Sequence, residues 1–89
     1  MTAVLTPELA LQYLAELEPA IEASAVVAAD GAHLAGDPSL HARLEAGGAG
    51  SERLLAARGA RHVVIARVRA GAPEALVRYD LEAVARDLG

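Results

Sequence analysis

The sequence contains no cysteine, so disulfide bonds, thiolate catalysis and zinc sites built on cysteine are excluded. No apolar run approaches the roughly 20 residues that a bilayer-spanning helix needs. The first residues also lack the basic-then-apolar pattern of a secretion signal. We therefore expect a cytoplasmic domain without a membrane partner.

Lysine is absent as well, so all eight basic residues are arginine, and two tyrosines are the only aromatic residues. With a net charge of −4 and a pI of 5.2, the chain has no overall attraction for nucleic acid. Its hydrophobic content of 54% is too high for a disordered chain. A length of 89 residues suits a single domain, residues 1–89.

Charge is unevenly distributed along the chain. Residues 1–50 carry seven acidic residues and one arginine, a net −6, whereas residues 51–89 carry five acidic residues and seven arginines, a net +2. Codon usage in a GC-rich genome would explain the arginines and the abundant alanine. Alternatively, the arginines line a surface that binds carboxylates or phosphates through bidentate contacts.

The first helix is predicted to start at Thr6-Pro7-Glu8, because threonine suits the N-cap, proline the first turn, and glutamate the positive end of the helix dipole. Pro19 lacks an amide proton and should end this helix near Glu18. Apolar residues at steps of four, three and four predict one shared buried face: Ala10, Leu14, Leu17 and Ile21.

Two strands are predicted on either side of Asp30-Gly31, over residues 23–29 and 32–36. An Asp-Gly pair between apolar segments is a strong hairpin signal. It predicts a tight turn with positive φ at both residues.

A second, short helix is predicted after Asp37-Pro38-Ser39, ending in the glycine-rich segment 47–50. Residues 51–59 are ambiguous. Ser51 could cap a helix, which the leucine, alanine and arginine content favours. Alternatively, residues 53–58 form a strand that turns at Gly59-Ala60, which the need to pair the following strand favours.

Residues 62–68 are predicted to form a strand covered on both faces, because Val63, Val64 and Ile65 are consecutive and apolar. A final helix is predicted from Glu74. Its apolar row is Val77, Leu81, Val84 and Leu88, and a row of alternating charge is Glu74, Arg78, Glu82 and Arg86. The chain should thus be an α+β domain with a central antiparallel sheet flanked by helices, in the order α-β-β-α-β-β-α.

Motifs for catalysis or cofactor binding are lacking. The glycines at 47, 48 and 50 do not form a P-loop, because a P-loop needs a lysine and the sequence has none. The three histidines, His33, His41 and His62, follow no metal-ligand spacing. We expect no enzyme activity, no cofactor and no metal. By elimination, Arg67, Arg69 and Arg78 are the candidates to receive an acidic partner.

The segment 25–37 (AVVAADGAHLAGD) resembles the first hairpin of the roadblock/dynein light chain family. The helix with Leu14 and Leu17 and the strand 63–68 fit the same layout, although residues 38–46 are short for that family's central helix. The resemblance implies a non-catalytic homodimer that regulates a small Ras-like GTPase or serves as a scaffold. Profilin-like and GAF-like sensor folds share these motifs, so a small ligand-binding domain is the alternative.

A thin, alanine-rich core points to the same self-association. Alanine buries little area, and small domains often gain stability by forming oligomers. We therefore expect a homodimer. The candidate interface residues are Leu40, Leu44, Leu54, Val63, Ile65, Arg67, Arg69 and Arg78.

Overall fold

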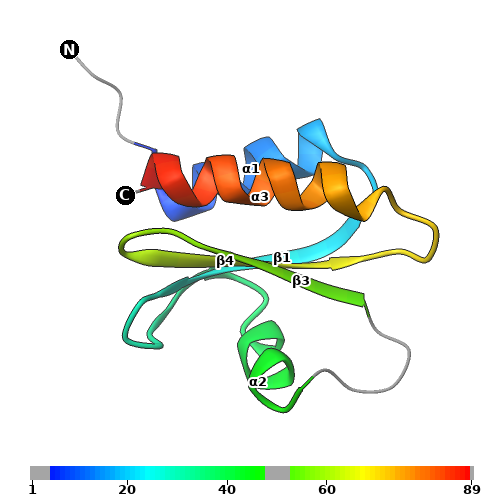
Figure 1. Ribbon diagram of the computed structural model, residues 1–89. Helices are drawn as coiled ribbons and strands as arrows, with labels where there is room; N and C mark the ends of the chain where they lie inside the picture. The colour runs from blue at the N-terminus through cyan, green and yellow to red at the C-terminus, as the bar shows by residue number, and fades with distance from the viewer. Residues whose placement is uncertain (1–4, 48–52, 89) are drawn as a thin grey trace.

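The computed structural model describes residues 5–47 and 53–88, which form one antiparallel sheet with helices on both faces (Figure 1). The predicted α+β class and element order are confirmed. The elements in chain order are α1 (Pro7–Leu17), β1 (Ile21–Ala28), β2 (His33–Gly36), α2 (Ser39–Glu45), β3 (Arg53–Arg58), β4 (His62–Val68) and α3 (Glu74–Leu88).

The sheet has the strand order β2-β1-β4-β3, and every neighbouring pair is antiparallel. Two hairpins, β1–β2 and β3–β4, therefore meet through their inner strands. The short β2 and the longer β3 are the two edges. Helices α1 and α3 lie side by side on one face, and α2 lies alone on the other (Figure 1).

Helix α1 begins and ends where the sequence predicts. The Oγ1 of Thr6 accepts a hydrogen bond from the backbone N–H of Leu9 at 3.2 Å, and the helix stops at Leu17, before Pro19. Ala10 and Leu14 are fully buried. Leu17 lies only about 20° around the helix from Ala10 but is 45% exposed. It is the last residue of α1, so the buried part of this face ends at Leu14.

The β1–β2 turn lies at Asp30-Gly31, but the predicted turn type was wrong. Gly31 has φ +97°, whereas no described residue other than glycine has a positive φ. The backbone N–H of Gly31 donates to the Ala28 carbonyl at 2.9 Å, and the Asp30 carboxylate accepts from the N–H of Ala32 at 3.0 Å. The loop is longer than two residues, so Asp30 adopts ordinary backbone angles and closes the turn through its side chain.

Residues 53–58 form a strand and not a helix, which resolves the ambiguity in the sequence. All six residues of β3 pair with β4, and the N–H of Gly59 donates to the His62 carbonyl at 2.8 Å. Local helix propensity is overridden here by pairing to a distant strand. Ser51, the alternative helix cap, lies outside the described residues.

The core divides into two parts, one on each face of the sheet. The larger part lies between the sheet and α1 and α3, and includes Leu14, Val26, Val64 and Leu81. The predicted apolar row of α3 is buried there except for its last residue, Leu88, which is partly buried. The smaller part lies beneath α2 and consists of Ala25, Val27, Leu40 and Ile65. Strand β4 is thus covered on both faces, as predicted.

Candidate interaction surface

Helix α2 covers the centre of its face of the sheet and leaves the margins open. Its fully buried residue is Leu40, which packs against Ala25, Val27 and Ile65 on the two inner strands. Leu40 and Ile65 are therefore core residues. Of the sequence-predicted apolar interface residues, Leu44, Leu54 and Val63 remain partly exposed around this core.

The edge strand β3 has no neighbouring strand on its outer side among the described residues. Leu54 and Ala56 face the α2 side, where they pair across from Arg67 and Ile65 of β4 and are only partly buried. Helix α2 packs mainly on β1 and β4. The outer edge of β3 therefore exposes unpaired backbone groups, and the partly buried side chains of Leu54 and Ala56 lie beside it on the α2 side.

On the opposite face, the charged row of α3 runs along the same edge. The Oε1 of Glu74 lies 3.3 Å from the Nη1 of Arg53 in β3. Glu82 and Arg86 line a cleft together with Arg58. Because Arg78 belongs to this row, it also lies on the β3 side of α3.

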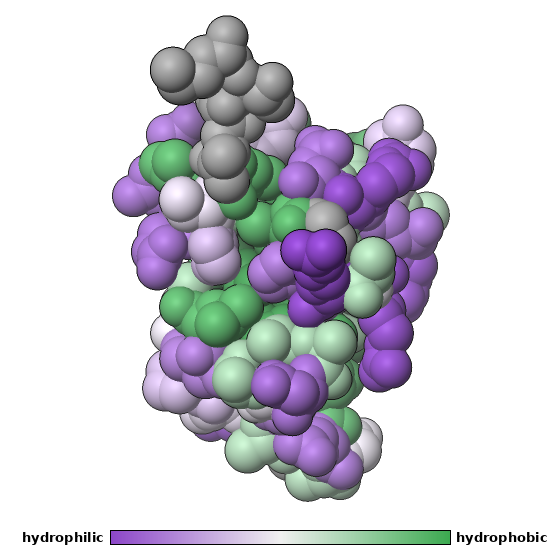
Figure 2. All heavy atoms as spheres, turned by 90° about the vertical axis from the view of Figure 1, so that its left-hand side faces the viewer, coloured by the Kyte–Doolittle hydropathy of each residue, from purple (hydrophilic) through white to green (hydrophobic). Residues whose placement is uncertain are grey.

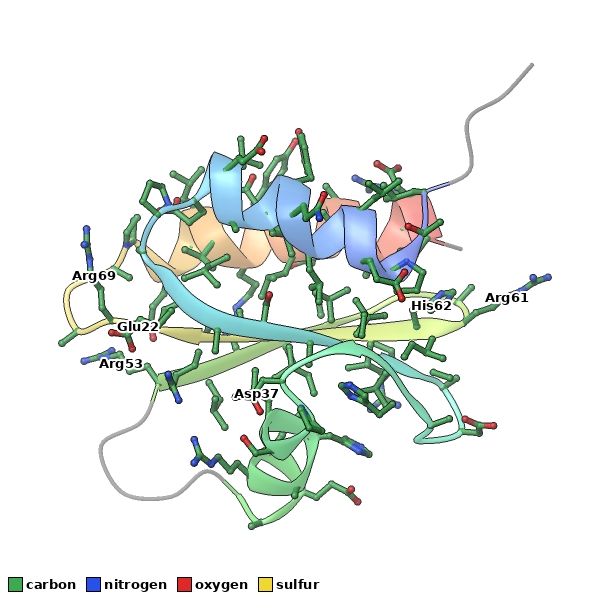
Figure 3. All side chains as sticks on the ribbon, turned by 180° about the vertical axis from the view of Figure 1, so that it is seen from behind. Glu22, Asp37, Arg53, Arg61, His62 and Arg69 are labelled. Carbon is green, nitrogen blue, oxygen red and sulfur yellow. The ribbon has the colours of Figure 1, made fainter. Side chains whose placement is uncertain are left out.

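The arginines do not form one continuous surface. Arg67 lies on the α2 side of β4, with its Nε 3.6 Å from the Oε1 of Glu22. Arg69 is exposed beyond the end of β4, and Arg78 lies on α3, across the sheet. In Figure 3, Arg53, Arg69 and Glu22 lie at one end of the sheet and Arg61 lies at the other. Arg67, Arg69 and Arg78 thus face three different directions.

Asp37 fixes the entry to α2. Its Oδ1 accepts hydrogen bonds from the hydroxyl of Ser39 at 2.8 Å and from the Ser39 backbone N–H at 2.9 Å. These two bonds, in that order, lower the pKa of Asp37 below its usual 3.8, with a further lowering by the positive charges of Arg43 and Arg67, while burial acts in the opposite direction. Asp37 is therefore a local helix-start residue.

A shallow cleft of about 300 Å³ lies between α2 and the two hairpin turns. It is lined by apolar residues and by three polar ones, His41, Glu45 and Arg58. The Nε2 of His41 lies 3.2 Å from the Oε1 of Glu45. Figure 2 views the side of the molecule with the hairpin turns and shows hydrophobic and hydrophilic atoms intermixed there, with hydrophilic atoms concentrated along its right-hand margin.

The histidines belong to three different elements, β2, α2 and β4. Within residues 5–47 and 53–88, no group of three His, Cys, Asp or Glu residues is placed to hold a metal ion. The Nδ1 of His62 is buried and has no hydrogen-bond partner in this part of the chain. Nor does any described helix have the length and apolar content needed to cross a bilayer.

The sequence-based search missed a second group of candidates, the large apolar residues on the outer sides of α1 and α3. Leu9, Tyr13, Leu17, Leu76 and Tyr79 are all exposed. Leu9, Tyr13 and Leu17 repeat at steps of four, so this row could have been recognised beside the buried row of Ala10 and Leu14.

Comparison of the chain with protein-family models, curated proteins and solved structures finds no match.

Proposed function

We propose that this chain is a non-catalytic protein-interaction module that works as a homodimer, with two β3 edges joined in one continuous antiparallel sheet. The unpartnered outer edge of β3 and its half-covered residues Leu54 and Ala56 support this arrangement. Joining the edges would pair their backbone groups and remove an exposed strand margin.

The charged row of α3 is the observation that carries the proposal. Its order is acidic, basic, acidic, basic at residues 74, 78, 82 and 86. When two such helices lie antiparallel about Asp80, every acid faces an arginine. Glu74 of one copy faces Arg86 of the other, and Arg78 faces Glu82. The row is therefore complementary to a second copy of itself.

The position of α3 over β3 matches this symmetry. Arg53 contacts Glu74 at one end of β3, and Gly59 lies against Ala85 at the other. With rises of about 3.3 Å per strand residue and 1.5 Å per helix residue, the middle of β3 at Ala56 lies near Asp80. A single twofold axis through Ala56 would therefore relate both the two β3 strands and the two α3 helices of the dimer.

The same axis brings no arginines of β3 together. It places Ala56 opposite Ala56, Leu54 opposite Arg58, and Arg53 opposite Gly59. Because α3 lies over β3 and β4, strands spaced about 4.8 Å apart put the two α3 helices about 10 Å apart, within the range of packed helices.

Charge reversal on α3 tests the proposal. Arg78→Glu or Glu82→Arg alone would place like charges across the interface, so each variant should sediment as a 9.1 kDa monomer at concentrations where the wild type is dimeric. Mixing the two variants should restore a dimer, because each then supplies the charge that the other lacks. Sedimentation equilibrium measures all three.

Leu54→Lys and Leu34→Lys are the matched pair for the strand edges, since Leu54 is on β3 and the exposed Leu34 is on β2 at the opposite edge. We expect Leu54→Lys to dissociate the dimer and Leu34→Lys to leave it intact, with circular dichroism confirming the fold of both. A monomeric wild type at micromolar concentration, or dissociation by Leu34→Lys alone, would contradict the proposal.

The proposal extends to a cytoplasmic regulator or scaffold with a small Ras-like GTPase as partner. Its support is the resemblance of segment 25–37 to the roadblock hairpin. Affinity capture from the source cells, followed by mass spectrometry, should enrich a protein with a G-x-x-x-x-G-K-[ST] phosphate loop. Enrichment only of proteins without that loop would count against the GTPase partner and leave the homodimer unaffected.

A small ligand-binding domain is the second candidate, because His41, Glu45 and Arg58 converge on the cleft beside α2. Its volume of about 300 Å³ is at the lower end for ligand sites. A metabolite that binds the native state there should raise the melting temperature in the wild type and not in Arg58→Ala.

A further inference from the structure

We propose that the outer face of α1 and α3 is a docking surface for a basic amphipathic helix of another protein. We define the helix-face patch as Leu9, Tyr13 and Leu17 of α1 with Leu76 and Tyr79 of α3. This inference goes beyond the homodimer, since Leu76 and the three α1 residues of the patch lie away from the β3 side of α3.

The patch gathers most of the exposed apolar bulk of the molecule. Six large hydrophobic residues are exposed in the described part of the chain, and five of them, at 45% to 68% exposure, are on these two helices. Both tyrosines of the sequence are among them. Exposed apolar residues that gather in this way mark interaction sites, and tyrosine is frequent among the residues that dominate binding energy.

The α1 part of the patch faces α3. Leu11 lies over Gly36 of β2, where a Cβ at that glycine would come within 2.7 Å of the Leu11 Cδ1. Tyr13 lies about 160° from Leu11 around the helix. Since Leu11 points to the β2 side, Tyr13 points to the side on which α3 packs.

The α3 part of the patch borders the same space. Glu82 lines the cleft on the β3 side of α3, and Asp80 lies about 160° from it, towards α1. Leu76 is one helical turn before Asp80 on that side. Leu76 of α3 and the apolar row of α1 thus border one another on the outer face of the two helices.

The surface around the helix-face patch carries negative charge. Helix α1 has no basic residue, and Glu16 borders its apolar row. Asp80 and Asp87 lie on the side of α3 towards α1, whereas Arg78 and Arg86 belong to the row on the β3 side. Among the described residues, Glu16, Asp80 and Asp87 have no ion-pair partner. The complementary partner is therefore apolar and basic.

A helix is the form of partner that fits. The patch lies on two helices, which offer ridges of side chains and no strand edge to extend. A second copy docked through this face would place the carboxylates of two such patches together, and these carboxylates would repel an anionic membrane.

A display library of helical peptides of about 18 residues, five turns long, is the probe. Selected binders should share an apolar row at steps of three and four, flanked by arginine or lysine. The ¹⁵N–¹H shifts that change on adding a selected peptide should cluster on α1 and α3. Affinity should fall as salt concentration rises.

Tyr13→Ser and Leu76→Ser should each weaken binding at least about tenfold, which corresponds to about 1.4 kcal/mol. Leu34→Ser, an equivalent change on β2 outside the patch, should bind as the wild type does. Asp80→Asn with Asp87→Asn should weaken binding and reduce its salt dependence. All substituted side chains except Asp80 are exposed, so circular dichroism should show an unchanged fold.

Four outcomes would overturn the inference, three of them in the binding experiments. These are selection of acidic or extended peptides, shift changes confined to another surface, and binding to phosphatidylserine vesicles that is lost in Tyr13→Ser. If Tyr13→Ser instead abolishes self-association, the patch binds a second copy and the inference also fails. If Arg78→Glu is monomeric and still binds the peptide, the helix-face patch is a different surface from the dimer contact.

Discussion

Gly59 lies directly against the backbone of Ala85. A Cβ at position 59 would overlap the Ala85 carbonyl oxygen and come within 2.9 Å of its carbon. Gly59 is in the β3–β4 turn and Ala85 is in the last turns of α3. The absence of a side chain at Gly59 therefore allows the helix to approach the hairpin, and this contact sets the position of α3 along β3.

Gly59→Ala should reduce the free energy of unfolding by about 1–3 kcal/mol, the usual cost of overpacking, because the neighbouring group is helix backbone that cannot rotate away. Urea denaturation at fixed protein concentration measures this. Gly71→Ala is the control. Gly71 has φ +83° with open space around it. Gly71→Ala should therefore lower the free energy of unfolding through backbone strain alone, by about 1 kcal/mol. A smaller cost at Gly59 than at Gly71 would contradict the role of the contact.

Leu40→Ala should cost about 2–5 kcal/mol of unfolding free energy, as for other fully buried leucines. Leu40 is the buried residue of α2, and its truncation removes the fully buried contact of this helix with Ala25, Val27 and Ile65. Leu44→Ala, one turn later and only partly buried, should cost less. Equal costs would mean that α2 is not held through Leu40. Amide exchange should show faster opening of α2 in Leu40→Ala.

The Asp37–Ser39 contact predicts a pH dependence of stability. Because hydrogen bonds from Ser39 lower the pKa of Asp37 below 3.8 in the folded state, the unfolded chain takes up this proton first as pH falls. The stabilisation is complete above the unfolded pKa and is lost as pH falls through the lower, folded value. The melting temperature of the wild type should exceed that of Asp37→Asn at pH 6, and the difference should shrink below pH 3.8.

Ser39→Ala is the companion variant, since it removes the hydroxyl that lowers the pKa most. Its melting temperature should depend less on pH than that of the wild type over the same range. If Asp37→Asn and the wild type keep a constant difference down to the lowest pH, the contact is not what lowers the pKa.

Local signals in the sequence predicted the elements well. Thr6-Pro7 and Pro19 bound α1, and Val64 and Ile65, from the consecutive apolar residues 63–65, are buried on opposite faces of β4. Residues 53–58 were ambiguous because their leucine and alanine content suits a helix, and the strand exists through pairing to β4. The Asp30-Gly31 turn was located correctly with the wrong geometry, since dipeptide identity does not fix loop length.

The candidate surface was less predictable for a related reason. Periodicity predicts which face of its own strand or helix carries Arg67 or Arg78. It does not predict which side of the sheet that face lies on, and the two arginines lie on opposite sides. Leu40 and Ile65 pack on each other within one chain. The alternating row of α3 was visible in the sequence, whereas its position along the β3 edge depends on how Gly59 meets Ala85.

The pairing of β1 with β4 has a consequence for how the chain folds. Each hairpin is made of strands close in sequence, but the central seam joins Ile21 to Val68 and Ala28 to His62. Such distant pairings are slow to form because the intervening chain must close first. We expect the two hairpins to be populated early and their association to limit the folding rate, so substitutions in the seam should slow refolding most.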